Sequence, residues 1–427
     1  MLKRSWQVAT ISSLSRKCNS VKDIGFYEVG CRCPYWSRRP LGGIFARFLV
    51  ASFIAGRDPL ELPNEHRVPL TWLVEHGCES VRLRTYRDLA PSGFASPESI
   101  QEASDAVAAS KLVTAITKKQ KPTGVWGKTL LGPAAPGGRG EKDMGALAEY
   151  RRLIELGLDS SARQIKLADR VFFRLLSRDP DPQLLFEFRT IAKTDPTIEG
   201  WARERIREAA TAALAEGGHS DDPRIRGSAH KIASSISQFL RSPLADKPLV
   251  KAGQKTLLHP DARPPTWYSV GMLAAMPSLR RERAGFTERL GAYLAKPGLK
   301  KDFAMRVGRR ILKPKALLMG DPIRADRQGS PKDIPLALHY IELLSRIGAL
   351  HTAPTASKVL ARLVKDCDEN GVWHPKNLRS RPKSSSLMAY HAFPLCPEAS
   401  TLESRQVDVT FRLALIAKHL GWDLTYR

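Results

Sequence analysis

One helix-stop pattern recurs three times in this 427-residue chain, and it constrains the fold more than any other feature. Helical runs end in apolar–Gly–apolar triplets centred on Gly157, Gly348 and Gly421. A glycine just past a helix can take the left-handed conformation that closes the last turn, and the next apolar residue packs back on the helix. Three copies of the same stop signal predict a repeated helical unit.

Helical periodicity dominates the chain from about Val68 onward. Apolar residues recur three and four positions apart in 147–158, in 338–347 and in 411–415. Alternation typical of strands is scarce, and short extended pieces are expected only beside the Gly-Val-Trp sequences described below. Gly/Pro-rich segments separate the helical blocks, as expected for short turns between helices. The pattern predicts an all-α fold made of antiparallel helix pairs.

The first 66 residues differ from the rest. They show no clean periodicity, and their first 22 residues contain no acid. We therefore expect residues 1–66 to be an irregular, disordered leader with one short helix around 43–55, and residues 67–427 to form the helical repeat domain. The basic start resembles a targeting segment in composition, but no apolar segment follows it directly, which argues against secretion. A start codon placed too far upstream is the alternative explanation, so whether these residues belong to the mature protein stays open.

The chain is strongly basic, with 68 Lys+Arg, 43 Asp+Glu and a net charge of +25. Such a balance favours polyanionic partners, although a general compositional bias gives the same number. Four basic residues have helical spacing, which predicts a basic helix face for a polyanion such as nucleic acid: Arg306, Arg309, Arg310 and Lys313. The alternative is an ordinary solvated helix face. No recognisable nucleic-acid motif accompanies these residues.

Six cysteines are too few and too scattered for a disulfide scaffold in a chain of this length. We expect reduced thiols and a cytoplasmic location. Cys31 and Cys33 lack a second matching pair, so no zinc site is expected. No segment has the length of apolar sequence that a membrane span requires.

A Gly-Val-Trp sequence occurs twice, at 124–126 and 371–373. Four residues before the glycine stands Gln120 in the first copy and Cys367 in the second. Each copy follows a helical pattern and precedes a loop and a new helix that ends in the apolar–Gly stop. Glycine permits a tight turn there, and tryptophan buries a large ring beside it.

This unit resembles the QW-type repeat of the squalene cyclase and protein prenyltransferase superfamily. The resemblance covers residues 68–160 and 335–427, whereas 165–330 has only degenerate remnants at 200–201 and 266–268. It implies an (α/α) toroid or a related helical repeat array, with inner and outer helices around a central cavity. Bacterial proteins of this repeat type have a C-terminal block similar to the one described below.

The catalytic signatures of that superfamily match poorly. Squalene cyclases use an Asp-x-Asp-Asp acid, and this chain has Asp366, Asp368 and then glutamate, within the turn itself, where acids usually cap helices or face water. Aromatic residues make up 7%, which is low for stabilising carbocations. Prenyltransferases bind zinc through Asp-x-Cys and a later histidine. Cys367 and His391 are the nearest equivalents, but the spacing is wrong, so no metal or cofactor is expected. Asp366, Asp368 and His391 remain weak catalytic candidates.

The C-terminal block is rich in unusual residues. Tyr390, His391, Asp408 and Arg412 could line a polar pocket in which the histidine titrates near neutrality. The alternative assigns the aromatic residues to packing and pairs Asp408 with Arg412 four residues on. The candidate ligand-binding residues, which are aromatic or polar, are Trp126, Trp373, Tyr390, His391, Asp408 and Arg412.

The sequence therefore favours a squalene-cyclase/prenyltransferase-like repeat protein that binds a small apolar ligand or a protein in its central cavity. One alternative is a HEAT-like protein that binds nucleic acid or another polyanion through its basic helix faces. Another is an active terpenoid cyclase or prenyltransferase. The residues decide neither whether catalysis occurs nor the substrate and the oligomeric state.

Overall fold

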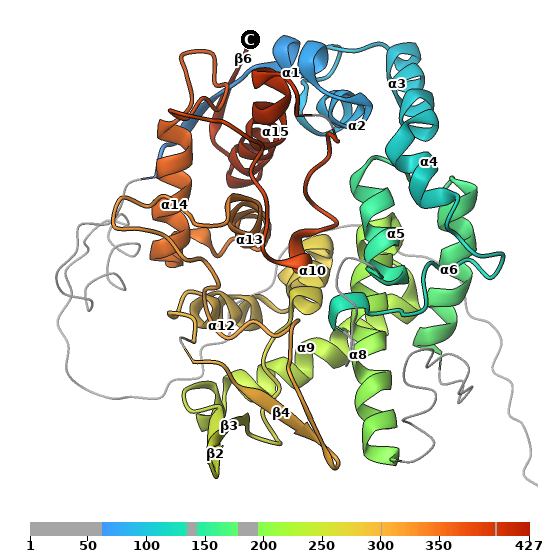
Figure 1. The fold of residues 1–427 in the computed structure, drawn as a ribbon, viewed down its shortest axis with the longest axis vertical. Helices are drawn as coiled ribbons and strands as arrows, with labels where there is room; N and C mark the ends of the chain where they lie inside the picture. The colour runs from blue at the N-terminus through green and yellow to red at the C-terminus, as the bar shows by residue number, and fades with distance from the viewer. Residues whose placement is uncertain (1–61, 135–142, 178–194, 300, 398) are drawn as a thin grey trace, which may run out of the picture. The chain divides into compact units, whose positions relative to one another are not determined.

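The structure is a computed structural model, and it describes residues 62–134, 143–177, 195–299, 301–397 and 399–427. These residues belong to one compact unit, Pro59–Arg427. They are mostly helical, as the periodicity predicts (Figure 1). The leader and its expected helix at 43–55 lie outside the described residues, except that the first strand begins at Glu65. No helix in the described part is long and apolar enough to cross a membrane.

The α-helices, in chain order, are α1 (Leu70–His76), α2 (Glu79–Arg84), α3 (Pro97–Ala109), α4 (Lys111–Thr117), α5 (Ala146–Glu155), α6 (Arg163–Leu176), α8 (Pro196–Leu214), α9 (Pro223–Leu240), α10 (Trp267–Ala275), α11 (Pro277–Glu282), α12 (Ala284–Leu294), α13 (Ile334–Arg346), α14 (Pro354–Lys365) and α15 (Leu402–Leu420). The strands are β1 (Glu65–Val68), β2 (Leu249–Ala252), β3 (Lys255–Leu258), β4 (Ala304–Val307), β5 (Arg310–Leu312) and β6 (Asp423–Tyr426).

Three helices are buried on every side. Burial is continuous over Trp267–Ala274 in α10, Ala337–Ser345 in α13 and Gln406–Ala417 in α15. A helix that is buried all round must lie between other elements. Accordingly α10 packs against α8, α9 and α13, and α13 packs against α14 and α15. These helices form the interior of the unit.

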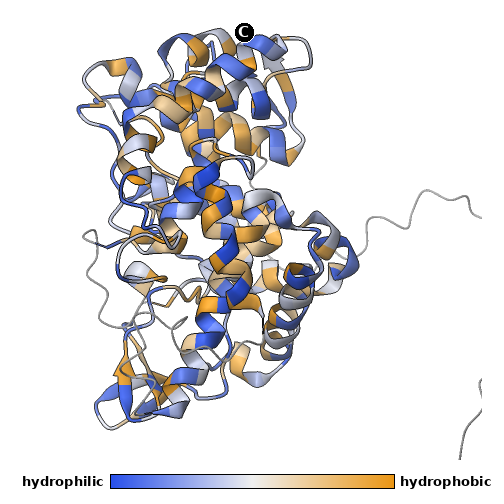
Figure 2. Cartoon of the chain, turned by 90° about the vertical axis from the view of Figure 1, so that its right-hand side faces the viewer, coloured by the Kyte–Doolittle hydropathy of each residue, from blue (hydrophilic) through white to orange (hydrophobic). Residues whose placement is uncertain are grey.

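Other helices bury only one face. In α9 the buried positions include Ile225, Ala229, Ala233 and Ile236, which recur every three or four residues. Such helices carry polar and apolar residues together, as Figure 2 shows for much of the chain. Helix α9 packs on α8 and α12, and α6 packs on α8. One-sided burial therefore marks the helices that cover the interior ones.

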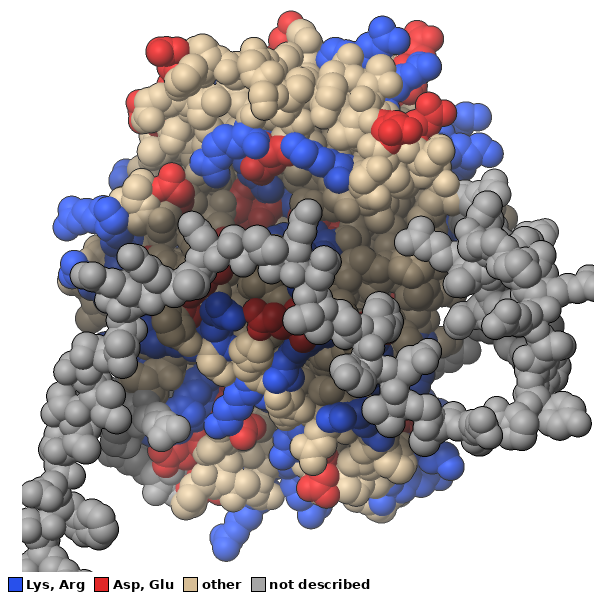
Figure 3. All heavy atoms as spheres, turned by 180° about the vertical axis from the view of Figure 1, so that it is seen from behind, with Lys and Arg blue, Asp and Glu red and all other residues tan. Residues whose placement is uncertain are grey.

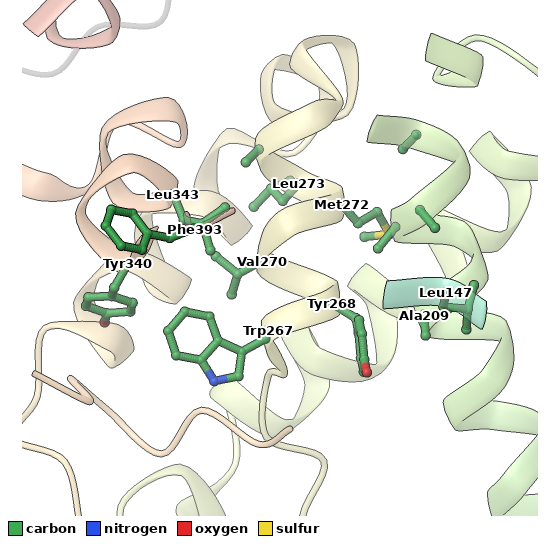
Figure 4. Packing of buried hydrophobic residues seen from close by; sticks show 14 of the residues in the cluster. Leu147, Ala209, Trp267, Tyr268, Val270, Met272, Leu273, Tyr340, Leu343 and Phe393 are labelled. Atoms are coloured by element: carbon green, nitrogen blue, oxygen red, sulfur yellow. The ribbon is translucent and has the colours of Figure 1, made fainter. Parts of the chain in front are cut away.

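Helix α10 lies at the centre of the core. Figure 4 shows Val270 of α10 on the side of Tyr340 in α13, whereas Met272 lies on the side of Ala209 in α8. All four side chains are buried, with at most 1% of their surface exposed. Because α10 has apolar residues on all its faces, it can contact both neighbours at once.

The first and last described elements pair with each other. Strand β1 runs parallel to β6, with Glu65 opposite Asp423 and Val68 opposite Tyr426. Helix α1 also packs against α15 (Figure 1). The first strand of the described chain thus lies beside the last one. Periodicity alone did not predict these strands, because each is only four residues long.

A four-stranded sheet replaces the basic helix expected around residues 306–313. Its order is β2-β3-β4-β5, with β3 and β4 parallel and the other pairs antiparallel. Val307 pairs with Arg310, so Gly308 and Arg309 form a two-residue hairpin turn. The helix prediction for this segment was wrong because the three-and-four spacing of its cations competes with a glycine that favours a hairpin turn.

The three predicted stop signals do end helices. Helices α5, α13 and α15 each end one or two residues before the glycine of the stop signal. In each case the residue after the glycine donates its N–H to the carbonyl five residues earlier, at 3.0 Å for Leu158, 2.8 Å for Ala349 and 3.1 Å for Trp422. This is the closing bond expected when a glycine ends a helix in the left-handed conformation.

The two Gly-Val-Trp turns have the same geometry. Gly124 and Gly371 have φ of +93° and +90°, and each N–H donates to the carbonyl three residues earlier, at 2.8 and 3.1 Å. A side chain at either position would collide with a backbone carbonyl, that of Leu167 or that of Arg67. Glycine is therefore required at both turns. The suggested remnants differ: Gly200 lies inside helix α8, and Trp267 begins α10.

Candidate functional site

The two candidate acids of the second Gly-Val-Trp turn act within that turn. Asp368 Oδ1 accepts the N–H groups of Asn370 and Val372, both at 2.9 Å. Asp366 pairs with Arg362 four residues earlier at 2.9 Å. These contacts are typical of acids that cap a turn and a helix end.

The two tryptophans of the turns are core residues. Trp126 is 2% exposed, and its indole N–H donates to the Ile116 carbonyl at 2.9 Å. Trp373 is 1% exposed, and its backbone N–H donates to Thr410 Oγ1 at 3.0 Å. Neither ring lines the pocket beside α8 that is described below.

The C-terminal candidates come together in one buried or half-buried group, here called the interior cluster. In it, charged residues of α2, α5, α13 and α15 meet the segment 390–396. Arg412 of α15 forms ion pairs with Glu155 of α5 and, at 2.8 Å, with Glu342 of α13. It also donates to the Ala392 carbonyl at 2.5 Å. The members of the cluster are Arg84, Arg151, Arg152, Glu155, His339, Glu342, Tyr390, His391, Asp408 and Arg412.

Asp408 does not pair with Arg412, contrary to the alternative based on their spacing. Its Oδ1 accepts the backbone N–H groups of Leu395 and Cys396 at 3.0 and 3.3 Å. Burial raises the pKa of the Asp408 carboxyl, although these two hydrogen bonds oppose the shift. Arg412 instead forms ion pairs with Glu155 of α5 and Glu342 of α13.

Two more arginines complete the cluster. Arg152 donates to the carbonyls of Tyr390 and His391, at 3.3 and 3.2 Å, and to that of Pro394. It therefore holds the backbone of the segment that carries two of the candidates. Arg151 makes a two-pronged ion pair with Glu216 at 2.5 and 2.7 Å. Such paired contacts fix a guanidinium firmly.

Two histidines face each other in the cluster. The His339 ring stacks on Trp267 with centroids 5.3 Å apart, and His391 meets it edge-on at 4.8 Å. Burial and the nearby Arg151 lower the pKa of His339 to about 3 and that of His391 well below its usual value. The expectation that His391 titrates near neutrality was therefore wrong, because desolvation disfavours the imidazolium.

These histidines predict a pH dependence of stability. Below pH 6.5 the unfolded chain takes up a proton on each histidine, whereas folded His339 stays neutral down to about pH 3. The contribution of neutral His339 to the free energy of unfolding is thus present above pH 6.5 and is lost as the pH falls toward 3. Between pH 7.5 and 5 we expect His339 to account for a loss of about 2 kcal/mol.

Urea denaturation at the two pH values measures this loss. In His339→Phe, which keeps a ring against Trp267, the difference between the two pH values should shrink by that amount. The same change at the exposed His351 is the control. An equal pH dependence in wild type and His339→Phe would mean that His339 does not titrate as a buried group.

A separate pocket of about 530 Å³ lies beside α8. Its walls come from residues 131–134, α8, the loop between β3 and α10, the β4–β5 hairpin and the segment 313–317. The volume falls within the range of about 300–1,000 Å³ that is typical of small-molecule sites. Most of its lining side chains are apolar, and they include the aromatic rings of Trp201 and Tyr268.

The pocket is also basic, and we call it the basic pocket. Five cationic residues line it against a single acid, Glu204; they are Arg205, Arg263, Arg306, Lys313 and Lys315. No salt bridge within the described part of the chain involves Arg306, Lys313 or Lys315. Two of the four predicted polyanion-binding residues thus line the basic pocket, whereas Arg309 and Arg310 lie on the same hairpin outside its lining.

The sequence did not predict most residues of the interior cluster or of the basic pocket. The cluster residues of α5 and α13 belong to helices with ordinary periodicity, in which the sequence does not distinguish a buried charged residue from an exposed one. The pocket lining is drawn from five separate segments, so no local pattern reveals it. A Glu or Arg at an otherwise apolar helix position was the one available signal, as at Glu155 and Glu342.

The described residues contain no group of three or more His, Cys, Asp or Glu side chains placed to hold a metal ion. The interior cluster and the basic pocket are the two candidate sites of the described chain. A scan against protein-family models, a search among curated proteins and a search among solved structures each found no match.

Proposed function

We propose that this protein binds a small amphiphilic anion in the basic pocket. The observation that carries the proposal is the combination, in one pocket of about 530 Å³, of an apolar lining with five cationic residues and one acid. An apolar body would pack against Trp201 and Tyr268, and a phosphate or carboxylate would meet the cations. Apolar walls with a few charged groups are the usual composition of a ligand site.

The cations are suitably placed for an anion. Arg306 lies on β4, while Lys313 and Lys315 follow β5, so both arms of one hairpin contribute. Their side chains are exposed, so an anion could meet them at low desolvation cost. An arginine offers paired donors to a phosphate or carboxylate, and lysines add point charges.

We also propose that the helices close into a ring of the (α/α) toroid type. Three observations support this proposal. The first and last strands pair, the fully buried helices α10, α13 and α15 are covered by helices with one-sided burial, and the two Gly-Val-Trp turns share one hydrogen-bond pattern. In such a ring the interior cluster would line the centre. The face seen from behind is hollowed, with acidic and basic side chains inside (Figure 3).

A nucleic-acid role has less support. Two other arginines that stand in basic stretches of the sequence, Arg280 of α11 and Arg381 of the loop before α15, are engaged within the protein. Arg280 donates to the carbonyls of Leu273 and Ala274, and Arg381 to those of Cys396 and Pro397. Lys and Arg are spread over the face in Figure 3 with acidic residues among them. A surface that binds nucleic acid is expected to be continuously basic.

Titration calorimetry with decyl phosphate, below its micelle concentration, tests the proposal. We expect one saturable site that weakens with salt, and weaker or no binding of decanol and of inorganic phosphate. The triple variant Arg306→Gln, Lys313→Gln and Lys315→Gln should bind about tenfold more weakly, because each charge contributes about 0.5 kcal/mol.

A matched control comes from the same hairpin. The double variant Arg309→Gln and Arg310→Gln removes two positive charges outside the pocket lining and should change affinity about twofold or less. Equal losses in both variants would mean that net charge alone drives binding. Tighter binding of a short oligonucleotide, in competition with decyl phosphate, would favour the nucleic-acid role over our proposal.

A further inference from the structure

Two thiols from distant parts of the chain touch. Cys78 and Cys396 are 318 residues apart in sequence, and their sulfur atoms are 2.6 Å apart. The backbone N–H of Cys78 also donates to Cys396 Sγ at 3.3 Å. Cys78 immediately precedes α2, and Cys396 lies in the loop before α15.

Neighbouring contacts hold both cysteines in place. The Cys396 backbone is bound on two sides, because its N–H donates to Asp408 and its carbonyl accepts from Arg381 at 2.7 Å. Cys78 is the residue that caps α2, and its carbonyl accepts from Arg82 at 2.9 Å. Thiols that already touch on fixed backbones can be bridged without a large movement of the chain.

The third cysteine of the described part has different surroundings. The Cys367 thiol donates to the Leu363 carbonyl at 3.7 Å, within its own helix end. Burial raises the pKa of this thiol to about 12, so little thiolate forms. The contact of Cys78 with Cys396 is therefore particular to that pair and is no general property of the cysteines.

We propose that Cys78 and Cys396 form a reversible disulfide in the presence of a low-molecular-weight disulfide as oxidant. The bond would join the first helix pair to segment 390–396 of the interior cluster. Reaction begins at Cys78, because it is half-buried whereas Cys396 is 4% exposed. The inference is independent of the ligand proposed for the basic pocket.

The chemistry takes two exchanges. The Cys78 thiolate attacks one sulfur of the oxidant, forms a mixed disulfide and releases one small thiolate. The Cys396 thiolate then attacks the Cys78 sulfur and releases the second. Each cysteine loses its thiol proton and the pair loses two electrons, and the oxidant is reduced to two thiols. The hydrogen bond to Cys78 and burial raise the pKa of Cys396, so the second exchange should be faster at higher pH.

The bond would restrict the cluster. Segment 390–396 carries Tyr390 and His391, and Arg152 already holds its carbonyls. A cross-link over 318 residues removes much of the freedom of the unfolded chain. We expect the thermal midpoint of the oxidised protein to rise on the order of 5 °C.

Peptide mapping of the full chain tests the proposal. After incubation with oxidised glutathione, trypsin digestion without reductant should give one linked species that joins peptide 68–82 to peptide 384–405. Reduction should split it and reverse the rise in the thermal midpoint. Cys367→Ser, the matched control, should leave both results unchanged.

Cys78→Ser and Cys396→Ser should each abolish the linked species and the rise in the midpoint. Because Cys396 is buried, its variant is also checked by circular dichroism, and Cys78→Ser alone suffices if the other does not fold. A stable glutathione adduct at Cys78 without the linked species would overturn the proposal. So would a cross-link from either cysteine to Cys18, Cys31 or Cys33.

Discussion

Replacing Arg412 with methionine is expected to lower the free energy of unfolding by about 3–5 kcal/mol. Arg412 is 3% exposed and forms ion pairs with Glu155 and Glu342. Methionine fills a similar volume but leaves Glu342 buried without its cation, and Glu155 with only Arg84. An unpaired buried carboxylate either stays charged at high cost or binds a proton.

Urea denaturation at pH 7 gives the free energy of unfolding of this variant. Arg226→Met is the control, because Arg226 and its partner Glu282 have side chains 45% and 38% exposed, and exposed pairs contribute about 0–1 kcal/mol. Adding Glu342→Gln to Arg412→Met should recover part of the loss, since one stranded charge is removed. A loss below about 1 kcal/mol in the single variant would show that water reaches the carboxylates.

Removing either turn tryptophan should have an effect of similar size. Trp126→Ala and Trp373→Ala should each cost about 3–5 kcal/mol, because each indole is almost fully buried and its removal leaves a cavity. The half-buried Trp72 is the control, and Trp72→Ala should cost about 1 kcal/mol.

The comparison also tests the equivalence of the two turns. In thermal and urea denaturation, the two turn variants should lose similar amounts of stability, and the Trp72→Ala control should lose clearly less. Trp126 has one contact that Trp373 lacks, the hydrogen bond from its indole to Ile116. Trp126→Ala is therefore expected to cost slightly more. A small loss at one turn alone would contradict the view that both anchor the same structural unit.

Periodicity and turn chemistry made much of the fold predictable. Helices α5, α13 and α15 end where the glycine stops predict, because a left-handed residue is a local requirement that glycine meets. The hairpin at Gly308 was missed because its strands are three and four residues long, too short for alternation to stand out. The pairing of β1 with β6 depends on contacts between chain ends, which no local pattern contains.

The candidate site was predictable only in part. Tyr390, His391, Asp408 and Arg412 do meet in one buried cluster, since the residues near one helix must pack together. Their partners Glu155 and Glu342 come from helices far away in sequence, so spacing could not identify them. Spacing also suggested an Asp408–Arg412 pair, whereas Asp408 accepts backbone N–H groups and Arg412 pairs with the two glutamates. The basic pocket gathers residues from between positions 131 and 317 of the chain and had no sequence signature.

The location of a bound amphiphile tests the central claim most directly. Crystals grown with 10-bromodecyl phosphate would give an anomalous bromine signal and phosphate density in one experiment. We expect the phosphate beside Arg306, Lys313 and Lys315, with the bromine deeper in the pocket near Trp201 and Tyr268. A ligand bound in the interior cluster, or a basic pocket left empty at saturating ligand while another surface is occupied, would contradict the account.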